Sequence, residues 1–420
     1  GIYGTYPGGV SSQLTLDLEH TSEPARAFSD RGEVRLDEAY VDFRLAELDF
    51  RVGLQKIVWG KADLVSPFDI LTARDLRDPF VFPTLEDRIA QAGIRVNYYF
   101  GDYSLEGFFS PVWIRSQVPQ AETDADGDTR MDEWFPPMAI YPTEGAYLEP
   151  NEMGLDWFIF MATYDEMEKP DKDLSTASFG TKMNMLKGDY DIDFYLLSTM
   201  DPMPTAEVRT VMATGTIDGL PGQGLVISID GHMLFRRVTV FGAAAARTFG
   251  PVALRSEVAF QGGKQYFRLF EPEDSEEAFA EMLYYGVGEV RGKPKSHAAL
   301  TWITGVDYEI PNLRILTSNQ LILTTRFSHE DYYTQGALDV NWSFHFSKGF
   351  KDDHLSTGLT GMAQFASGSI WLGPSVTYTL PSYEDLQLGL KMNIFGGEEF
   401  STVGMYSGQS NLLFTVKWWY

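Results

Sequence analysis

Large apolar and polar residues alternate over several long segments in the C-terminal third of the chain. The clearest segments are 338–346, 370–380, 386–394 and 412–420. Because successive side chains of a strand point to opposite faces, a period of two predicts β-strands with one apolar and one polar face. These segments run for about 10–12 residues, whereas strands of globular proteins usually have about 5–6 residues and strands that cross a bilayer at a tilt have about 9–11. The pattern therefore favours membrane-crossing strands over those of a soluble sandwich.

The polar faces of these segments carry charged residues, for example Asp339 and Lys391. Charges on that face fit a water-filled lumen, and aromatic residues at segment ends fit the interfacial girdles of a membrane barrel. In lipid the sheet has to close, since an open edge leaves unpaired N–H and C=O groups that cost several kcal/mol each. The predicted fold class is an all-β, transmembrane, antiparallel β-barrel. The aromatic residues at segment ends are Phe100, Tyr103, Tyr308, Phe327, Phe346, Tyr378, Trp418 and Tyr420.

We expect a single barrel over residues 1–420 with about 16 strands. Short turns alternate with long connections, which is the arrangement of periplasmic turns and extracellular loops. The apolar run 157–161 leaves two alternatives open, because it is either one of two further strands, giving 18, or a loop segment packed into the lumen. The long connections, extracellular or folded into the lumen, are 61–88, 115–174, 201–230, 263–296 and 397–410. The predicted strands are 12–20, 33–46, 47–60, 88–100, 103–114, 175–186, 189–200, 231–247, 251–262, 297–309, 313–327, 336–347, 354–366, 369–380, 385–396 and 411–420.

Composition narrows the functional classes. The chain has 420 residues, no cysteine and a formal net charge of −26. Structural disulfides and cysteine-based metal or redox sites are excluded, and a strongly acidic chain lacks the basic face that nucleic-acid binding requires. The charge-free stretch 355–383 is interrupted by Gly, Ser, Thr, Gln and Pro, so it does not predict a membrane helix. No secretory leader heads the chain, so we expect either an intracellular protein or a mature chain after cleavage, and the barrel pattern favours the second.

Two segments resemble known outer-membrane proteins. The alternating residues 414–420 end in an aromatic and resemble the C-terminal signature of Gram-negative outer-membrane proteins, which implies recognition by the barrel assembly machinery. Segment 47–114, with Arg51-Val-Gly-Leu-Gln55 followed by Trp59-Gly60, resembles an uncharacterised proteobacterial outer-membrane family that is related to porin-like barrels. Leu54 departs from that family's pattern. The resemblance supports the barrel and names no substrate.

The sequence shows no catalytic motif, so we expect no enzyme. Its six histidines are scattered, and it has neither a His-Glu-x-x-His pair nor a Gly-x-Ser-x-Gly elbow. Charges at inward strand positions instead predict a pore lining, and the interleaved charges of loop 61–88 suit either an inward-folded constriction or a salt-bridged rim loop. The pore-lining candidates are Asp42, Arg44, Arg51, Gln55, Arg95, Asp191, Asp193, Arg255, Glu257, Asp307, Arg314, Asp339 and Lys391, and the constriction-loop candidates are Asp63, Asp69, Arg74, Asp75, Arg77 and Asp78.

One acidic segment has the spacing of a calcium loop. With Glu122 as position 1, acidic residues fall at positions 1, 3, 5 and 12 and glycine at position 6. A shifted register and a solvated loop without metal are the alternatives. Carboxylate oxygens favour Ca²⁺ over a transition metal. The candidate ligands are Glu122, Asp124, Asp126, Asp128, Asp132 and Glu133.

Residues 272–285 predict a short amphipathic helix. The segment begins with proline, carries acidic residues in its first turn, and places Phe279, Met282 and Leu283 at helical spacing. Such a helix either folds over the mouth or into the lumen, or caps the surface.

These features predict an outer-membrane channel for passive diffusion of small polar solutes or ions, with no required cofactor. The acidic excess predicts a mild preference for cations. The alternatives are a ligand-specific uptake barrel for a siderophore, lipid or hydrophobic compound, and a barrel sheath around an electron-transfer or secreted partner. Expected partners are outer-membrane lipid, lipopolysaccharide, the assembly machinery and the permeant, and both a monomer and a homotrimer stay open.

Overall fold

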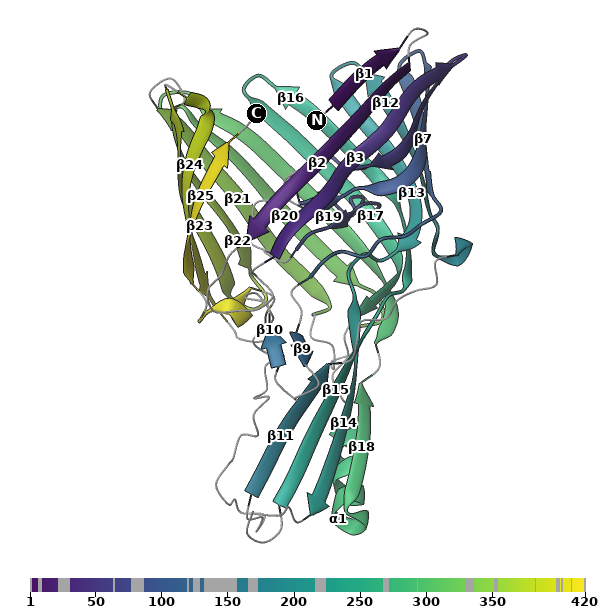
Figure 1. Ribbon diagram of the computed structural model, residues 1–420, viewed down its shortest axis with the longest axis vertical. Helices are drawn as coiled ribbons and strands as arrows, with labels where there is room; N and C mark the ends of the chain where they lie inside the picture. Colours follow the sequence, from purple (N-terminus) through teal and green to yellow (C-terminus); the bar gives the residue numbers. More distant parts are fainter. Residues whose placement is uncertain are drawn as a thin grey trace.

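The structure is a computed structural model, drawn as a ribbon in Figure 1. All statements below concern the residues that it describes. These are 2–6, 10–21, 31–62, 65–76, 87–118, 121–123, 129–131, 157–164, 173–215, 224–266, 272–292, 294–329, 336–350, 354–381, 383–397, 401, 403–408 and 410–418.

One antiparallel sheet of 17 strands forms the barrel wall. Strands that follow one another along the wall pair with each other, and the chain leaves the wall after β4, β8, β13 and β17 before it returns to the next position. The wall strands in order are β1 (Ile2–Tyr6), β2 (Val10–Thr21), β3 (Arg31–Leu45), β4 (Leu48–Gln55), β7 (Gln91–Phe100), β8 (Tyr103–Ser110), β12 (Ser178–Lys187), β13 (Tyr190–Met200), β16 (Arg237–Phe249), β17 (Val252–Tyr266), β19 (Lys295–Ile310), β20 (Ile315–Arg326), β21 (Leu338–Phe350), β22 (Leu355–Gln364), β23 (Ser369–Leu380), β24 (Tyr383–Gly396) and β25 (Asn411–Trp418).

The predicted antiparallel barrel is confirmed, because the strands from β2 to β25 of the wall correspond one to one to the predicted strands. The short β1 is an additional strand. The predicted boundaries differ most at two strands. The strand predicted over 47–60 ends at Gln55, because the chain then turns onto the inner face of the wall, and the strand predicted over 231–247 is divided at Phe235 and Arg236, where the chain crosses from one sheet to another.

The two faces of the wall differ in chemistry, as β13 illustrates. Asp193, Tyr195 and Leu197 are buried on the inner face, whereas Phe194 and Leu196 between them are 44% and 51% exposed on the outer face. This is the alternation that the sequence predicts for a strand between a filled lumen and lipid.

Short turns and both chain ends lie at one end of the barrel (Figure 1). Gly101, Gly188 and Gly250 occupy such turns with φ of 61°, 62° and 57°, a conformation that glycine adopts without steric cost. The long connections leave from the opposite end, which we call the long-loop end.

Three long connections build a second sheet, the distal module, which extends from the long-loop end (Figure 1). Its strands in spatial order are β11 (Trp157–Tyr164), β15 (Gly224–Leu234), β14 (Thr205–Gly215) and β18 (Val287–Gly292). β11 runs parallel to β15, and the other pairs are antiparallel. Run 157–161 is therefore neither a barrel strand nor a segment packed into the lumen, so both expectations are wrong.

Helix α1 (Pro272–Tyr285) packs on β18 and β14. The predicted helix is confirmed, and its place is a surface of the distal module rather than the lumen. Ala278 and Met282 are buried on its inner side. A Cβ at Gly288 would lie 1.8 Å from the carbonyl oxygen of Ala278, so the close approach of helix and strand requires glycine there.

The smaller elements are two short hairpins and two single turns of 3₁₀ helix. β5 (Ala73–Arg74) pairs with β6 (Arg88–Ile89), and β9 (Ala121–Thr123) pairs with β10 (Thr129–Met131). The 3₁₀ turns are η2 (Leu174–Thr176) and η3 (Gly404–Tyr406). Within the described ranges, none of the helices is both long and apolar enough to cross a membrane.

Candidate functional site

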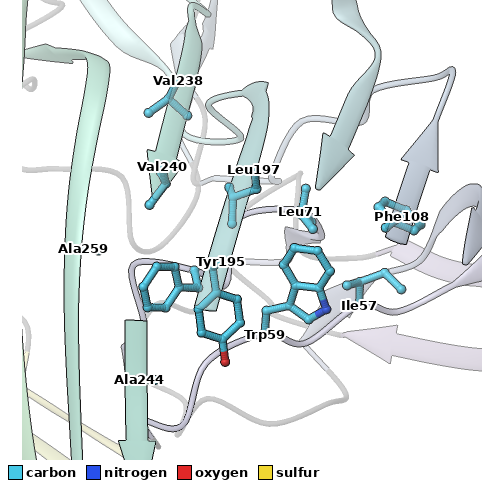
Figure 2. Packing of buried hydrophobic residues seen from close by; sticks show 11 residues of the cluster. Ile57, Trp59, Leu71, Phe108, Tyr195, Leu197, Val238, Val240, Ala244 and Ala259 are labelled. Atoms are coloured by element: carbon cyan, nitrogen blue, oxygen red, sulfur yellow. The ribbon is translucent and has the colours of Figure 1, made fainter. Parts of the chain in front are cut away.

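The connection after β4 folds against the inner face of the wall. We call residues 56–62 and 65–76 the inward segment. Ile57, Trp59, Phe68 and Leu71 from this segment are buried together with inner-face residues of β8, β13, β16 and β17 (Figure 2). The wall residues of this cluster are Phe108, Tyr195, Leu197, Val238, Val240, Ala244 and Ala259.

Small wall residues make room for the large side chains of the inward segment. A Cβ at Gly180 would lie 2.6 Å from the Trp59 ring, and one at Gly242 would lie 2.9 Å from the Phe68 ring. The Phe68 ring also stacks on Tyr195, with centroids 4.1 Å apart. Because tight packing leaves no slack at these points, the wall fixes where the segment lies.

A single buried carboxylate binds the turn of the inward segment. Glu257 on β17 is fully buried and accepts hydrogen bonds from the backbone N–H of Lys61, from that of Ala62 at 2.7 Å, and from the Ser66 hydroxyl at 2.7 Å. Gly60, with φ of 108°, lets the chain turn just before these donors. Hydrogen bonds to a carboxylate are stronger than neutral ones, so Glu257 is the main polar anchor of this turn.

The ammonium group of Lys61 makes the second anchor. Its Nζ lies 2.7 Å from Asp191 and 2.8 Å from Asp193 on β13. Asn184 and Tyr195 also donate hydrogen bonds to Asp193, at 2.8 and 2.7 Å. Burial disfavours the charge of Lys61, but the two carboxylates outweigh this effect and raise its pKa above the ordinary value.

A third anchor lies at the indole of Trp59. Its Nε1–H donates to Glu106 Oε1 at 2.8 Å. The Glu106 carboxylate also binds Arg95 at 2.8 Å and Lys182 at 3.0 Å, so it is compensated by two cations although its side chain is only 4% exposed. A buried acid with this many partners is held in place, and it orients the ring that donates to it.

The far end of the inward segment is held by a compact ion-pair cluster. Asp69 pairs with Arg88, and Arg74 pairs with Asp87 at 2.9 Å. The backbone N–H of Leu76 donates to Gln117 at 2.7 Å. Among the constriction candidates, Asp69 and Arg74 belong to this cluster and Asp75 bridges to Gln117, whereas Asp63, Arg77 and Asp78 lie outside the described residues.

The opposite wall carries a smaller inward loop. Val403 and Tyr406, around η3, are buried against Trp371 of β23 and Phe395 of β24, which stand eight and nine wall positions from β12. Neutral hydrogen bonds fix it, from Val403 N–H to Gln364 at 3.2 Å and between Ser369 and Ser401 at 2.6 Å. This loop and the inward segment therefore both pack on the inner face of the wall, but at different strands. Lys61 of the inward segment reaches Asp191, which lies three residues from Gly188 of the short-turn end.

The pore-lining candidates fall into three groups. Asp191, Asp193, Glu257 and Arg255 contact the inward segment directly, and Arg95 contacts it through Glu106. Gln55 directly precedes the segment and donates to the backbone carbonyl oxygens of Arg51 and Gly93. Other pairs link neighbouring strands, namely Arg51 with Asp42, Arg255 with Asp307, and Asp339 with Arg326, and Lys391 lies 5.1 Å above the Trp371 ring. Arg44 and Arg314 lie at turns of the short-turn rim, where Arg314 is exposed.

Sequence reasoning missed several residues of the site, chiefly Trp59, Lys61, Glu106 and Lys182. Trp59 falls at the end of the predicted strand 47–60. Lys61 is the first residue of the predicted constriction loop 61–88, but it is not among the residues chosen there as candidates. Glu106 and Lys182 alternate with apolar residues on β8 and β12, and that alternation was a usable signal. Their partners on other strands could not be deduced from it.

The predicted calcium ligands are mostly outside the described residues. Glu122 lies in β9, whose pairing with β10 brings Thr123 opposite Thr129. Asp124, Asp126, Asp128, Asp132 and Glu133 are not described. Within the residues whose side chains the structure describes, there is no group of three acidic or histidine residues that could hold a metal ion.

Several solved structures resemble this chain over most of its length. OccD3 (OpdP) of Pseudomonas aeruginosa has a TM-score of 0.46 and 9% identity, over 99% of this chain and 82% of that chain. OccAB1 of Acinetobacter baumannii has a TM-score of 0.45 and 9% identity, over 99% and 92%. The outer-membrane channel DcaP of A. baumannii has a TM-score of 0.40 and 8% identity, over 94% and 82%. At this level, likeness carries no argument about function.

Sequence comparison is more direct. A search of curated proteins gives no match. A family model described as a protein of unknown function, DUF1302, matches residues 7–280, which is more than half of the chain and includes the segment 47–114. This match bears out the resemblance of that segment to an uncharacterised family, and the chain belongs to the DUF1302 family.

Proposed function

We propose that this protein is an outer-membrane channel through which small solutes cross by passive diffusion. The observation that carries the proposal is the two-sided wall, with an apolar outer face and an inner face of ion pairs and an inward segment. No catalytic role is assigned to any residue. Reconstitution of the full chain in planar bilayers tests the proposal: stepwise conductance is expected, and a chain that inserts without conducting would contradict it.

The outer face supports insertion in a bilayer. Large apolar side chains on every part of the wall are 36% exposed or more, which would be costly in water but is favourable in lipid. Aromatic residues gather beside the short turns, where a membrane interface would lie. These aromatic residues are Phe100, Tyr103, Tyr190, Phe249, Phe350 and Tyr378.

The inward segment supports a selective rather than a wide passage. Ile57 and Trp59 point into the wall, so Val58 between them points the other way and is 45% exposed. Val65 on the same segment is 44% exposed. We place the narrowest part of the passage at these residues.

The paired charges support weak ion selectivity with a mild preference for cations. Most inner-face charges are opposed by a partner. The ammonium of Lys61 faces two carboxylates, and in the described part of the chain Glu257 is bound only by neutral donors, which together outweigh the one extra cation at Glu106. A local excess of acid attracts cations into a confined passage. Reversal potentials in a salt gradient measure this preference, and clear anion selectivity would contradict it.

A second candidate function is uptake of a particular ligand that has an apolar part. The exposed valines of the inward segment and the aromatic cluster on the opposite wall favour it, since apolar solutes bind apolar linings. Saturation of flux at rising concentrations of one apolar solute would distinguish this candidate from simple diffusion, whose flux rises in proportion.

We further propose that the acidic segment 122–133, which includes β10 and part of β9, binds Ca²⁺. Support comes from the spacing of its carboxylates and from the pairing of these two strands, which brings its ends together. Calorimetric titration of the full chain with Ca²⁺ is expected to show one site that Asp126→Asn weakens. Equal heats of Ca²⁺ binding for the unchanged protein and for Asp126→Asn would contradict the proposed site.

A further inference from the structure

The edge of β2 is the place where this barrel has to close. β2 pairs with β3 on one side and with β1 on the other, through the register Gly4↔Ser12 and Thr5↔Ser11. β25 pairs with β24, and no described residue of β25 pairs with β1 or β2. In Figure 1, β25 and the hairpin of β1 and β2 stand on the two sides of this seam.

The strand directions allow either β1 or β25 to pair with the same edge of β2. β2 runs from the short-turn end toward the long-loop end, and β1 and β25 both run the opposite way. Either strand can therefore pair antiparallel with β2. Closure by β25 gives an even, fully antiparallel barrel, whereas closure of β25 onto β1 would create a parallel pair and an odd number of strands.

Exposure and length favour β25 as the closing strand. Its outer-face residues Leu412, Phe414 and Val416 are 59–68% exposed, whereas Leu390, Met392 and Ile394 on the neighbouring β24 are 37–45% exposed. The difference is that of a strand without a second neighbour. β25 has eight residues and β1 has five, and a free strand edge in lipid leaves several unpaired N–H and C=O groups.

We propose that β1 and β25 are alternative partners for the same edge of β2, so that the barrel has a seam which β25 closes and β1 holds open. With β1 on β2, the lumen communicates sideways with the surroundings along the free edge of β25. With β25 on β2, β1 is released and the wall is sealed. The seam goes beyond the proposed channel function, because it describes how the wall closes and not what passes through it.

The absence of native cysteine permits a direct test by disulfide cross-linking in lipid vesicles. Ser11→Cys is combined with Leu413→Cys, Thr415→Cys or Lys417→Cys, which we assign to the inner face by their alternation with the exposed residues of β25. β1 is weakened by the double change Gly4→Pro and Thr5→Pro, because one of two successive strand residues donates its N–H to the neighbour and proline cannot donate. Gly4→Ala with Thr5→Ala is the matched control.

The expected result is a severalfold rise in the cross-link between Ser11→Cys and one position of β25 in the proline variant, with no rise in the alanine variant. The pair Gln387→Cys and Lys417→Cys, which face each other between β24 and β25, reports folding and should cross-link equally in all variants. Three results would overturn the proposal: an unchanged yield in the proline variant, no link between β2 and β25 in any variant, or a link from β25 to a cysteine on β1.

Discussion

Two ion-pair networks in this chain have similar chemistry but lie in different surroundings, one inside the barrel and one on the surface of the distal module. At the inward segment, Lys61 binds Asp191 and Asp193 with side-chain exposures of 11%, 43% and 7%. On the distal module, Arg209 bridges Asp230 and Glu289 across three strands at 3.5 and 2.8 Å, and all three side chains are more than 30% exposed. Exposed pairs contribute little to stability, whereas a buried pair that loses one partner leaves a costly charge. We infer that the network at the inward segment holds that segment in place, whereas the network on the distal module contributes little to the stability of the module.

The strongest test of this contrast is Lys61→Met. Removing the ammonium leaves Asp193, whose side chain is 7% exposed, without its cation, and breaking a buried pair costs on the order of 3 kcal/mol. The half-exposed Asp191 adds less to this cost. We expect the inward segment to detach part of the time, with larger and noisier single-channel currents and stronger cation selectivity. Conductance and reversal potential measure both effects.

The matched control for that change is Lys264→Met. Lys264 also pairs with a carboxylate, Asp201 at 2.6 Å, and neither residue contacts the inward segment in any described hydrogen bond or ion pair. The control should conduct like the unchanged protein. Equal currents from Lys61→Met and the unchanged protein would show that this ion pair does not hold the segment.

A smaller effect is expected from Glu257→Gln. The amide keeps the shape of the side chain but loses the charge to which Lys61, Ala62 and Ser66 donate. Hydrogen bonds to a charged group contribute about 1.5–3 kcal/mol, so backbone amides of the turn should exchange faster with deuterium. Asp339→Asn, on β21 three wall positions from β17, makes the same chemical change and should leave that exchange unaltered. If the turn amides exchange as slowly in Glu257→Gln as in Asp339→Asn, Glu257 does not hold the turn in place.

The distal module should tolerate the loss of its network. Arg209→Ala removes the centre of an exposed ladder, and we expect no measurable change in the thermal midpoint of the full chain, since exposed ion pairs are screened by solvent. Differential scanning calorimetry at moderate salt measures this. A midpoint that falls as far as in Lys61→Met would break the contrast between the two networks.

The smallest effect concerns acid. Hydrogen bonds from Arg209 and Arg291 lower the pKa of Glu289 to about 2, below the roughly 4.3 of an unfolded chain. A lowered folded-state pKa means that the stabilisation is present above the unfolded value and is lost as pH falls through about 2. Hydrogen–deuterium exchange of the β18 backbone amides, corrected for intrinsic rates, should therefore become faster as the pH falls from about 4.3 to about 2 in the unchanged protein. The Glu289→Gln variant should show no such rise. Identical profiles would contradict the assignment.

The period of two was enough to predict the wall, because each strand between lipid and lumen has to show it. The inward segment was harder. Loop 61–88 was proposed as a constriction on its charges, yet its anchoring residues begin at Ile57 and the partners Glu106 and Glu257 lie on strands far along the chain. Such contacts depend on how the sheet curves and on register, which local pattern does not specify.

The distal module was not predicted for a related reason. β11, β14, β15 and β18 come from three separate connections, and each is an ordinary apolar segment until its neighbours assemble. The helix at 272–285 was predicted because capping and spacing are local signals. The surface on which the helix packs, where Gly288 allows Ala278 to come close, depends on residues outside the helix and has no such local signal.

The central claim is that solutes pass beside the inward segment through the lumen of a membrane barrel. Thiol labelling of Val58→Cys during current recording tests it most directly, because the chain has no other cysteine. Val58 is 45% exposed on the inward segment, and Leu196 is 51% exposed on the outer face of β13. A bulky, water-soluble thiol reagent should reduce the current through Val58→Cys and leave the current through Leu196→Cys unchanged. An unaltered current in Val58→Cys, with labelling verified by mass, would contradict the account.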